Sequence, residues 1–499
     1  MLGTILALVA LLSVYYVVSA IYFLTLHPLA DVPGPKICAF SRIPYWLVAF
    51  KGDDIHWMKS LHDQYGPVVR FGPTDLSYTA TEAWNDIHGH KVSEKAPEFS
   101  VQPVNGECRH GHDPRVPPML TASSENHPRV RRLFSPAFSE RGLRQQEPLF
   151  RKYGDLLMYK ISEVGEEGGK PVEMAQLLNF ATFDVMAELC FGQSLGLLAK
   201  NEYSPWVKAI FESLKMLPIA AMINYYPIFN AIFTRFQPKS VMEQRVTHYK
   251  HTEERVKQRL QNGSDQPDVW NLVLGAEEGK GLTMEEMISN AELFMLAGSE
   301  TTATLLSGCI YNLLSCPEKM KTLLEEVRSS FTKVDDLTFE RLAEMKYLNA
   351  CTKEALRIYP PVPIGSPRVV LPGGQRILGK WVPPETRVSV HHWSVYKSEA
   401  NFKNPDTFAP ERWLKTDPIY AADALEAHQP FGTGPRNCLG QNMAMHEMRL
   451  ILATLLFQYD LELCSESRDW KKQKSFALWI KNPLMIRAKP LATQARLNI

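Results

Sequence analysis

The sequence contains little of several features that define other classes of protein. Eight cysteines in 499 residues, with no Cys-x-x-Cys pair, are too few for a disulfide scaffold or a structural zinc site of ordinary spacing. Lys plus Arg (55) and Asp plus Glu (54) nearly cancel, so the net charge of +1 gives no reason to expect a nucleic-acid partner. No Gly-x-Gly-x-x-Gly occurs, so the usual dinucleotide fingerprint is missing as well.

The composition is typical of a globular chain, with 45% hydrophobic and 22% charged residues. Helical periodicity dominates, and the segments with strand character are short. The expected helices cover 53–65, 128–160, 171–190, 240–260, 283–315, 317–331, 339–358 and 438–458. The expected strands are Val68–Phe71, Arg387–His391 and Phe476–Trp479, with a hairpin turn at Pro372-Gly373-Gly374. These patterns predict a mainly α fold with a minor β-sheet, in one continuous domain over residues 51–499.

The chain begins with a long uncharged segment, from Leu2 to Leu26. As a helix this segment would be about 37 Å long, and the hydrocarbon core of a bilayer is about 30 Å thick. A cleaved signal peptide usually has a basic start and a shorter apolar core, and this segment has neither. We therefore expect residues 1–27 to form a retained transmembrane signal anchor. Lys36 and Arg42 follow it, which favours a cytosolic body.

Prolines mark two further segments. Pro28, Pro33 and Pro35 cannot continue a helix, so residues 28–50 are expected to begin as a stiff, extended link between anchor and body. A second uncharged stretch, Met216–Thr234, also contains two prolines. This stretch is either a buried loop between helices or an apolar surface that enters the same bilayer, and the sequence leaves both interpretations open.

A long apolar helix is expected over residues 283–315, because Thr283 and Glu286 form a capping box and a Cys-Pro pair ends the pattern. Its apolar residues lie almost all round, so the helix should pass through the core. Gly298 and Glu300 nevertheless sit in its middle, where glycine weakens a helix and an unpartnered acid is costly to bury. Such local conflicts are typical of a functional site, and the alternative is a kinked helix with a satisfied acid.

An acid and a base, Glu354 and Arg357, lie one turn apart on another expected helix. Alone, such a pair is typical of a solvated surface bridge that contributes little to stability. Arg412 follows later, in a proline-bounded loop. If Arg412 reaches the pair, the three side chains form a network that pins the loop to the helix.

The most informative segment surrounds Cys438. Gly432, Gly434 and a proline make a compact turn, and a helical pattern begins at or just after the cysteine. The dipole and free N–H groups of a helix N-terminus stabilise a thiolate, and Arg436 adds positive charge nearby. This arrangement suits a nucleophile or a metal ligand. A nucleophile needs a histidine base, whereas a ligand without a second cysteine suits iron with one axial thiolate.

Four motifs follow one another along the chain. They are Ala297-Gly298-x-Glu300-Thr301-Thr302, Glu354-x-x-Arg357, Pro410-Glu411-Arg412 and Phe431-x-x-Gly434-x-Arg436-x-Cys438-x-Gly440. Together they resemble the oxygen-activating helix, the two parts of the structural triad and the heme-binding signature of the cytochrome P450 family. The resemblance covers nearly the whole chain and implies the cytochrome P450 fold, preceded by an N-terminal transmembrane helix.

By this resemblance Cys438 is the thiolate ligand of the iron in heme b, a ligand that favours O–O cleavage. Phe431 is expected to shield the sulfur, and Gly440 belongs to the same signature. The heme propionates need basic partners. The resemblance implies that these are His127, Arg131, Arg368 and Arg436, with His127 standing where many members have Trp.

The resemblance also implies catalytic roles on the long helix. Glu300 and Thr301 are expected to deliver protons for oxygen activation, and Gly298 to leave room for dioxygen. This acid–alcohol pair favours a monooxygenase that inserts one oxygen atom from O2 into an apolar small molecule. The alternative is a heme-thiolate isomerase or dehydratase that needs neither O2 nor a reductase.

The implied electron source is NADPH, through a cytochrome P450 reductase at the endoplasmic reticulum membrane, with the catalytic domain on the cytosolic side. The proline-rich link and the His-for-Trp change look like filamentous-fungal members, many of which oxidise polyketides, terpenoids or alkaloids in secondary metabolism. Substrate contacts are expected from the loop Val101–Leu120 and from Phe294, Met295, Ala297, Phe476 and Leu478.

Overall fold

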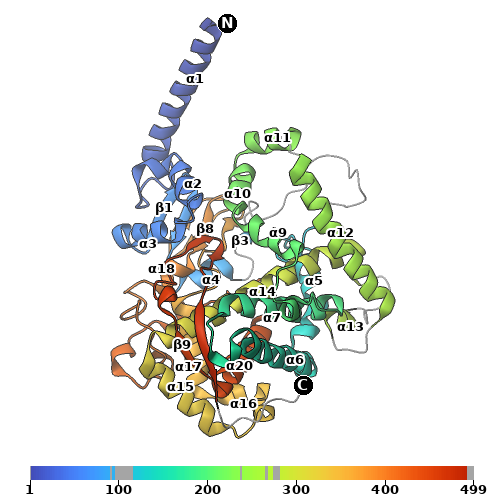
Figure 1. Cartoon of the computed structure of the whole chain (residues 1–499). Coiled ribbons are helices and arrows are strands. Elements are labelled where there is room, and N and C mark those ends of the chain that lie inside the picture. The colour runs from blue at the N-terminus through green and yellow to red at the C-terminus, as the bar shows by residue number, and fades with distance from the viewer. Residues whose placement is uncertain are drawn as a thin grey trace.

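The structure, a computed structural model, describes residues 2–89, 93–95, 116–236, 239–263, 268–273 and 281–491. Figure 1 shows a body built mostly of helices, with the helix α1 projecting from one end. Small sheets accompany the helices. This is the mainly α fold with a minor β component that the sequence predicts.

The helices divide between the two halves of the chain. The first half contains α1 (Leu2–Ile21), α2 (Ile43–Ala49), α3 (Asp54–Tyr65), α4 (Ala83–His88), α5 (His127–Phe134), α6 (Glu140–Val164), α7 (Met174–Phe191), α8 (Leu197–Lys200), α9 (Pro205–Leu214), α10 (Leu217–Tyr225) and α11 (Pro227–Arg235). The second half contains α12 (Lys239–Asn262), α13 (Val269–Val273), α14 (Met284–Leu314), α15 (Pro317–Ser330), α16 (Phe339–Glu344), α17 (Lys346–Ile358), α18 (His392–Tyr396), α19 (Glu411–Leu414) and α20 (Gln441–Gln458).

The strands of the described residues form four small sheets. The largest has the order β1 (Val68–Gly72), β2 (Asp75–Tyr78), β8 (Arg387–Val390), β5 (Arg368–Val370) and β3 (Ser93–Lys95), and only its β2–β8 pair is parallel. The others are β4 (Val172–Glu173), β12 (Met485–Pro490) and β9 (Tyr459–Leu463); β6 (Gln375–Ile377) with β7 (Lys380–Val382); and β10 (Lys474–Phe476) with β11 (Leu478–Ile480).

Two predicted β features are wrong. The turn at Pro372-Gly373-Gly374 is not a hairpin, because it joins β5 of the largest sheet to β6, which pairs with β7 instead. The segment Phe476–Trp479 is not one strand, because β10 and β11 pair across Ala477, whose φ is 68°. A residue with a left-handed backbone conformation at this point allows the chain to reverse. Alanine rarely adopts this conformation, so the sequence does not indicate the turn.

Two predicted helices are divided. The helix expected over 128–160 breaks between α5 and α6, where Pro136 lies in a short 3₁₀ turn and the Ser139 hydroxyl caps α6 by accepting from Gly142 N at 3.2 Å. The helix expected over 339–358 breaks at Met345, which separates α16 from α17. Helical periodicity continues across both breaks, so the pattern alone does not reveal them.

The core is organised around α14, which passes through the body as predicted (Figure 1). Its capping box is present, with Glu286 N donating to the Thr283 hydroxyl at 3.2 Å and Thr283 N donating to Glu286 at 3.0 Å. By length and composition α14 could cross a membrane, but it is mostly buried in the protein. It is therefore the core helix, and it packs along α7, whose residues are nearly all buried.

One buried arginine ties the N-terminal helix to the body. The Arg70 guanidinium on β1 donates to the carbonyl oxygens of Phe23 (3.0 Å), Leu29 (2.9 Å), Ala39 (3.1 Å) and Pro73 (2.7 Å). These acceptors belong to the end of the N-terminal helix, to the proline-rich link and to the sheet. The link is therefore fastened to β1 rather than free to swing.

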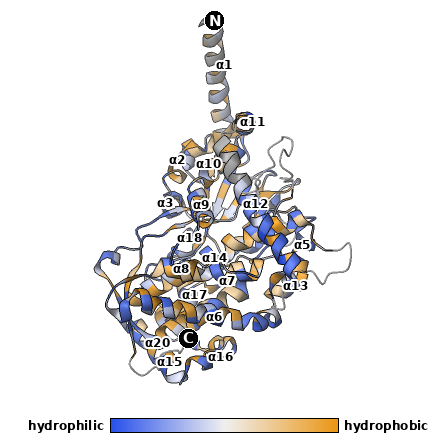
Figure 2. Cartoon of the chain, turned by 45° about the vertical axis from the view of Figure 1, so that its right-hand side comes forward, coloured by the Kyte–Doolittle hydropathy of each residue, from blue (hydrophilic) through white to orange (hydrophobic). Residues whose placement is uncertain are grey.

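The stretch predicted over Met216–Thr234 forms two short helices, α10 and α11. Pro218 and Pro227 stand in their first turns, where proline suits a helix start. The interpretation as a buried loop is wrong, because α10 contains no buried residue and Ile228 and Phe229 of α11 are exposed. Figures 1 and 2 both place α2, α10 and α11 at the end of the body from which α1 projects.

Candidate functional site

The cysteine segment forms a closed loop before α20. Cys438 N donates to Phe431 O at 2.8 Å, and Asn437 N donates to Gly434 O at 3.1 Å. Gly434 has a φ of 76°, and a Cβ there would lie 1.8 Å from the carbonyl oxygen of His88 on α4. Only glycine permits this close approach, so the loop is fixed against α4.

Cys438 is accessible to solvent, although neighbouring protein atoms surround its thiol. It is exposed to solvent, yet burial by neighbouring atoms raises the pKa of its thiol. A backbone hydrogen bond from Gly440 and the charge of Arg131 both oppose this rise and favour the thiolate. Within the described ranges no three His, Cys, Asp or Glu side chains gather as a metal site. A metal at Cys438 therefore needs further ligands from a cofactor.

Two arginines tie the cysteine loop to its surroundings, Arg131 from outside the loop and Arg436 from within it. Arg131 on α5 donates to Asn437 O at 2.6 Å and to Asn437 Oδ1 at 2.7 Å. Arg436 donates to Ala122 O at 2.8 Å. His127, at the start of α5, is buried and lies one helical turn before Arg131. Three of the four residues predicted to bind propionates are thus brought to this loop and to the helix beside it.

The fourth, Arg368 on β5, is buried and incompletely partnered. Its Nε donates to His88 Nδ1 at 3.3 Å, whereas its Nη1 has no partner among the described residues. Burial, with the nearby charge of Arg436, lowers the pKa of Arg368 to about 10. Two cations that lie close enough for one to lower the pKa of the other are stabilised by anionic oxygen atoms between them. The donor set therefore fits a heme whose propionates would bind at these arginines.

A face of α14 is accessible in the middle of the buried helix. Ala297 is exposed and Thr301 is half-buried, although Ser299 and Glu300 between them are buried. Residues four apart share one helix face. The Thr301 hydroxyl donates to Ala297 O at 2.6 Å on that face. Thr301 is therefore a polar side chain of this motif that meets solvent-accessible space, beside the exposed Ala297.

Gly298 lies against a neighbouring helix. A Cβ at Gly298 would lie 2.5 Å from the sulfur of Met186 on α7. The glycine thus lets α7 approach, and its expected role of leaving room for dioxygen stays a prediction.

Among the described residues, the Glu300 carboxylate forms no hydrogen bond with the Thr301 hydroxyl. It is buried, forms an ion pair with Lys481, and accepts a hydrogen bond from the Thr304 hydroxyl at 3.2 Å. Lys481 lies 181 residues along the chain, and nothing in the local sequence around a single lysine indicates this partner. The acid is therefore satisfied on one oxygen by a cation that sequence reasoning missed.

The predicted substrate contacts divide into two groups. Phe294 packs its ring 4.8 Å from Phe134, and Met295 is fully buried, so core packing accounts for both. Phe476 and Leu478 are half-buried on either side of the β10–β11 turn. In the loop Val101–Leu120, residues 101–115 lie outside the described residues.

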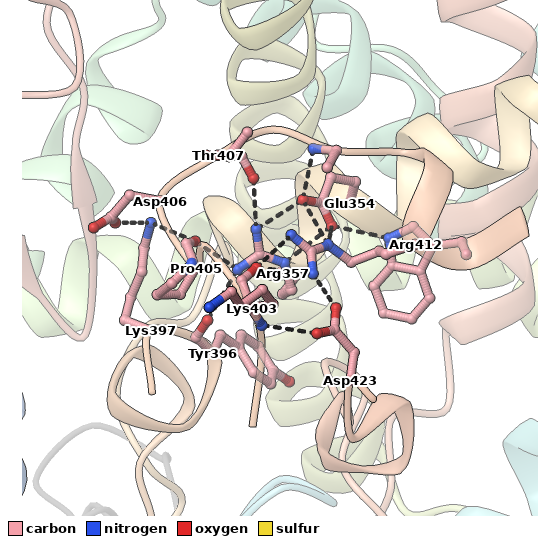
Figure 3. A network of polar contacts seen from close by, with 12 residues as sticks. Glu354, Arg357, Tyr396, Lys397, Lys403, Pro405, Asp406, Thr407, Arg412 and Asp423 are labelled. Atoms are coloured by element: carbon pink, nitrogen blue, oxygen red, sulfur yellow. Dashed lines mark hydrogen bonds and ion pairs between the residues drawn. The ribbon is translucent and has the colours of Figure 1, made fainter. Parts of the chain in front are cut away.

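The acid–base pair on α17 is part of a buried network (Figure 3). Arg357 donates to Glu354 at 2.7 and 2.9 Å, and Arg412 on α19 donates to the same carboxylate at 3.2 Å. Arg412 also forms an ion pair with Asp423, a partner that the sequence did not reveal. The remaining bonds to Glu354 come from Ala409 N and Trp413 Nε1, each at 2.9 Å. The three predicted side chains therefore do meet, and they join a loop to a helix.

Comparisons with known proteins agree with this geometry. The family model described as Cytochrome P450 matches residues 38–488. The cytochrome P450 monooxygenase efuB of Hormonema carpetanum is 42% identical over 493 residues, 97% of this chain and 96% of its own. The cytochrome P450 monooxygenase FUM2 of Gibberella moniliformis is 43% identical over 469 residues (93% and 98%), and the averantin hydroxylase of Dothistroma septosporum 39% over 494 residues (98% and 92%). The chain therefore belongs to the cytochrome P450 family and is an oxidoreductase of its monooxygenase class.

Proposed function

We propose that this chain binds heme b through Cys438 and inserts one oxygen atom from O2 into an apolar small molecule. The observation that carries the proposal is an accessible thiol, surrounded by neighbouring protein atoms, in the same loop as Arg436. The buried and incompletely partnered Arg368 lies near Arg436. Bound heme supplies oxygen activation and electron transfer, whereas the protein supplies binding, orientation and protons.

The residues around Cys438 prepare the binding site. The Gly440 N–H and the Arg131 charge favour the thiolate form, and Phe431 closes the loop through its backbone bond to Cys438. We assign His127, Arg131, Arg368 and Arg436 to the propionates, because guanidinium groups pair well with carboxylates.

Proton supply is assigned to Thr301 and Glu300. The Thr301 hydroxyl lies on the accessible face of α14 and donates to Ala297 O. It can exchange this bond for one to water and so hold a proton at its oxygen. Glu300 is the neighbouring acid that replenishes this proton, once its side chain turns from Lys481.

The proposed substrate is an apolar small molecule, in keeping with the accessible residue types. Ala297 of α14 and Phe476 and Leu478 of the hairpin present apolar side chains. The relatives are fungal monooxygenases, and the name of one gives averantin as the compound it hydroxylates. These names support a fungal secondary metabolite as the substrate class.

The proposed location is the endoplasmic reticulum membrane, with the body on the cytosolic side. The uncharged segment Leu2–Leu26 supports a single span, and the exposed apolar residues of α2, α10 and α11 support contact with the same bilayer. Ile43, Leu47, Ile228 and Phe229 are among these residues. Electrons are then supplied by NADPH through a membrane-bound cytochrome P450 reductase.

The reduced, carbon monoxide difference spectrum of the purified full chain tests the heme assignment. The red-shifted band of thiolate ligation is expected in the wild type and in Cys464→Ser, a matched control at a half-buried cysteine. Cys438→Ser should lose that band, because no other cysteine lies in the loop. A band that survives in Cys438→Ser would contradict the ligand assignment.

Reconstitution with reductase tests the reaction class. Candidate metabolites are first screened by the spectral shift that accompanies binding, and hits are incubated with NADPH in oxygen or argon. A monooxygenase forms product only with both NADPH and oxygen, and one atom of labelled O2 appears in the product. Product in argon without NADPH would identify the alternative, an isomerase or dehydratase.

A further inference from the structure

The side chain of Lys481 crosses from the end of a surface hairpin into the centre of the body. Lys481 directly follows β11, and its side chain is 7% exposed. Its Nζ forms the ion pair with Glu300, donates to the Thr304 hydroxyl at 2.8 Å, and approaches Asn179 Oδ1 on α7 at 3.4 Å. Three hydrogen-bond acceptors from two core helices thus converge on one lysine.

Glu300 is only half satisfied by this arrangement. Its Oε1 is bonded to Lys481 and Thr304, whereas its buried Oε2 has no partner among the described residues. A buried ion pair with an unfilled acceptor is a poor device for stability, because the desolvation of both charges is incompletely compensated. The open oxygen is instead suited to accept a hydrogen bond, and a proton, from water.

The hairpin that carries Lys481 is also the hairpin that we assign to the substrate pocket. Phe476 and Leu478 flank its turn, and Leu478 is three residues from Lys481. Each strand is anchored at its central residue, because Ser475 N donates to Gly52 O at 3.0 Å and Trp479 Nε1 donates to Pro360 O at 2.8 Å. Only the short, paired strand β11 therefore separates the turn from the lysine.

We infer that Lys481 is a positioning residue that couples occupancy of the substrate pocket to proton supply. Lys481 holds the Glu300 carboxylate away from Thr301 when the pocket is empty, and movement of the β10–β11 turn against a bound molecule loosens this hold. The released carboxylate takes up a proton from bulk solvent, relayed by water molecules that are themselves left neutral, and passes it toward the Thr301 hydroxyl. Glu300 then returns to its ionised form, and Lys481 keeps its own proton throughout. This inference rests on the proposed function.

Infrared difference spectroscopy of the full-length holoprotein tests the coupling without turnover. The carbonyl band of a protonated Glu300 is identified as the band that disappears in Glu300→Gln. Phenylimidazole, an apolar compound with a nitrogen that binds heme iron, serves as the pocket-filling probe. In the wild type we expect the Glu300 band to be absent without the probe and to appear with it. A wild-type spectrum in which the probe leaves Glu300 unchanged would overturn the inference, and this arm needs no lysine variant.

Lysine variants supply the second arm. Lys481→Met should show the Glu300 band with and without the probe, and should release peroxide severalfold faster with NADPH and reductase in the absence of substrate. Lys481→Arg should retain the wild-type behaviour. The matched control is Lys474→Met on the same hairpin, where an exposed lysine pairs with Asp53 at the surface. Equal behaviour of Lys481→Met and Lys474→Met would refute the role of Lys481.

The carbon monoxide difference spectrum separates this failure from failure of the proposed function. A wild type without the thiolate band would contradict the heme assignment itself. A normal thiolate band in all variants, together with an indifferent Glu300 band, would leave the monooxygenase proposal standing and remove only the coupling by Lys481.

Discussion

Two groups of buried arginines in this protein differ in how completely they are partnered. Around Glu354, both arginines meet carboxylates, and Arg357 also donates to the backbone oxygens of Tyr396 and Pro405 (Figure 3). Around Cys438, by contrast, Arg368 keeps a buried nitrogen without a partner among the described residues. We call the first group the closed network, because the protein alone supplies its hydrogen-bond partners. We call the second the open site, because one of its buried donors has no partner among the described residues.

The difference separates a structural network from a ligand site. Buried polar groups in native proteins are almost always hydrogen-bonded, so an unpartnered buried cation calls for an explanation. At Arg368 the explanation that we propose is an anionic group supplied from outside the chain. The Glu354 network needs no such group, and its function is to pin the loop that contains Arg412 onto α17.

The largest expected effect comes from opening the closed network. Glu354→Gln would leave Arg357 buried with a neutral partner and Arg412 with Asp423 as its remaining carboxylate, and we expect a loss of about 3–5 kcal/mol in the free energy of unfolding. Denaturant unfolding measures this loss. The control is Glu411→Gln, because Glu411 pairs with Lys319 near the surface, and its loss should stay below about 1 kcal/mol. Equal losses would mean that burial does not explain how much the Glu354 network contributes to the free energy of unfolding.

The open site responds differently. Arg368→Met should weaken heme retention by about 10–100-fold, as is typical when groups around a metal site are removed. It should not destabilise the heme-free chain, because it removes an incompletely partnered buried charge. Transfer of heme to an excess acceptor protein measures retention. Arg376→Met is the control, since the exposed Arg376 on β6 donates to Gly379 O at 2.8 Å, within its own hairpin. A loss of stability in heme-free Arg368→Met would indicate instead that Arg368 stabilises the fold, as Arg357 and Arg412 do.

Two glycine substitutions, one on α14 and one on α6, test whether Gly298 is required for helix packing. Gly298→Ala should cost about 1–3 kcal/mol, because its new methyl group would press against Met186. Gly154→Ala in α6 should instead gain up to about 1 kcal/mol, because nothing lies within 4 Å of a Cβ there. Thermal unfolding of both variants checks the opposite signs. A stable Gly298→Ala with impaired oxygen binding would instead support the prediction that this glycine accommodates dioxygen.

The smallest effect concerns a buried acid that belongs to neither of the two arginine groups. Both oxygens of Glu447 on α20 are unpartnered among the described residues, and burial raises its pKa to about 8. The unfolded chain loses this proton near pH 4.3, so between about pH 5 and 7 only the folded protein holds it and stability falls as pH rises, by at most about 1.4 kcal/mol per unit. Glu447→Gln should remove this part of the slope. Denaturant titrations at pH 6 and 7 compare the two slopes, and parallel curves would contradict the raised pKa.

Much of the fold could be predicted because its signals are local. The capping box at Thr283 and the proline after α14 fix both ends of the core helix, and Gly434 marks the compact cysteine loop. The breaks at Ser139 and Met345 were missed because the hydrophobic period continues through them. The conformation of Ala477 was missed because alanine rarely adopts it.

The candidate site could be predicted only as a set of residue types in order. Family motifs named Cys438, Arg368 and Thr301, but no motif names Lys481 or Asp423, whose partners are decided by how distant segments pack. The same limit applies to Gly298, since which side of a helix faces a neighbour depends on the neighbour.

Local sequence signals account for the helical class, the uncharged N-terminal segment and the cysteine loop, because each follows from periodicity or from residues close together in the chain. The incomplete partnering of Arg368, the ion pair of Glu300 with Lys481 and the attachment of the N-terminal link to β1 by Arg70 became visible only in the folded protein. These features depend on contacts between segments far apart in sequence, and the energy of such a contact exists only once the chain has folded around it.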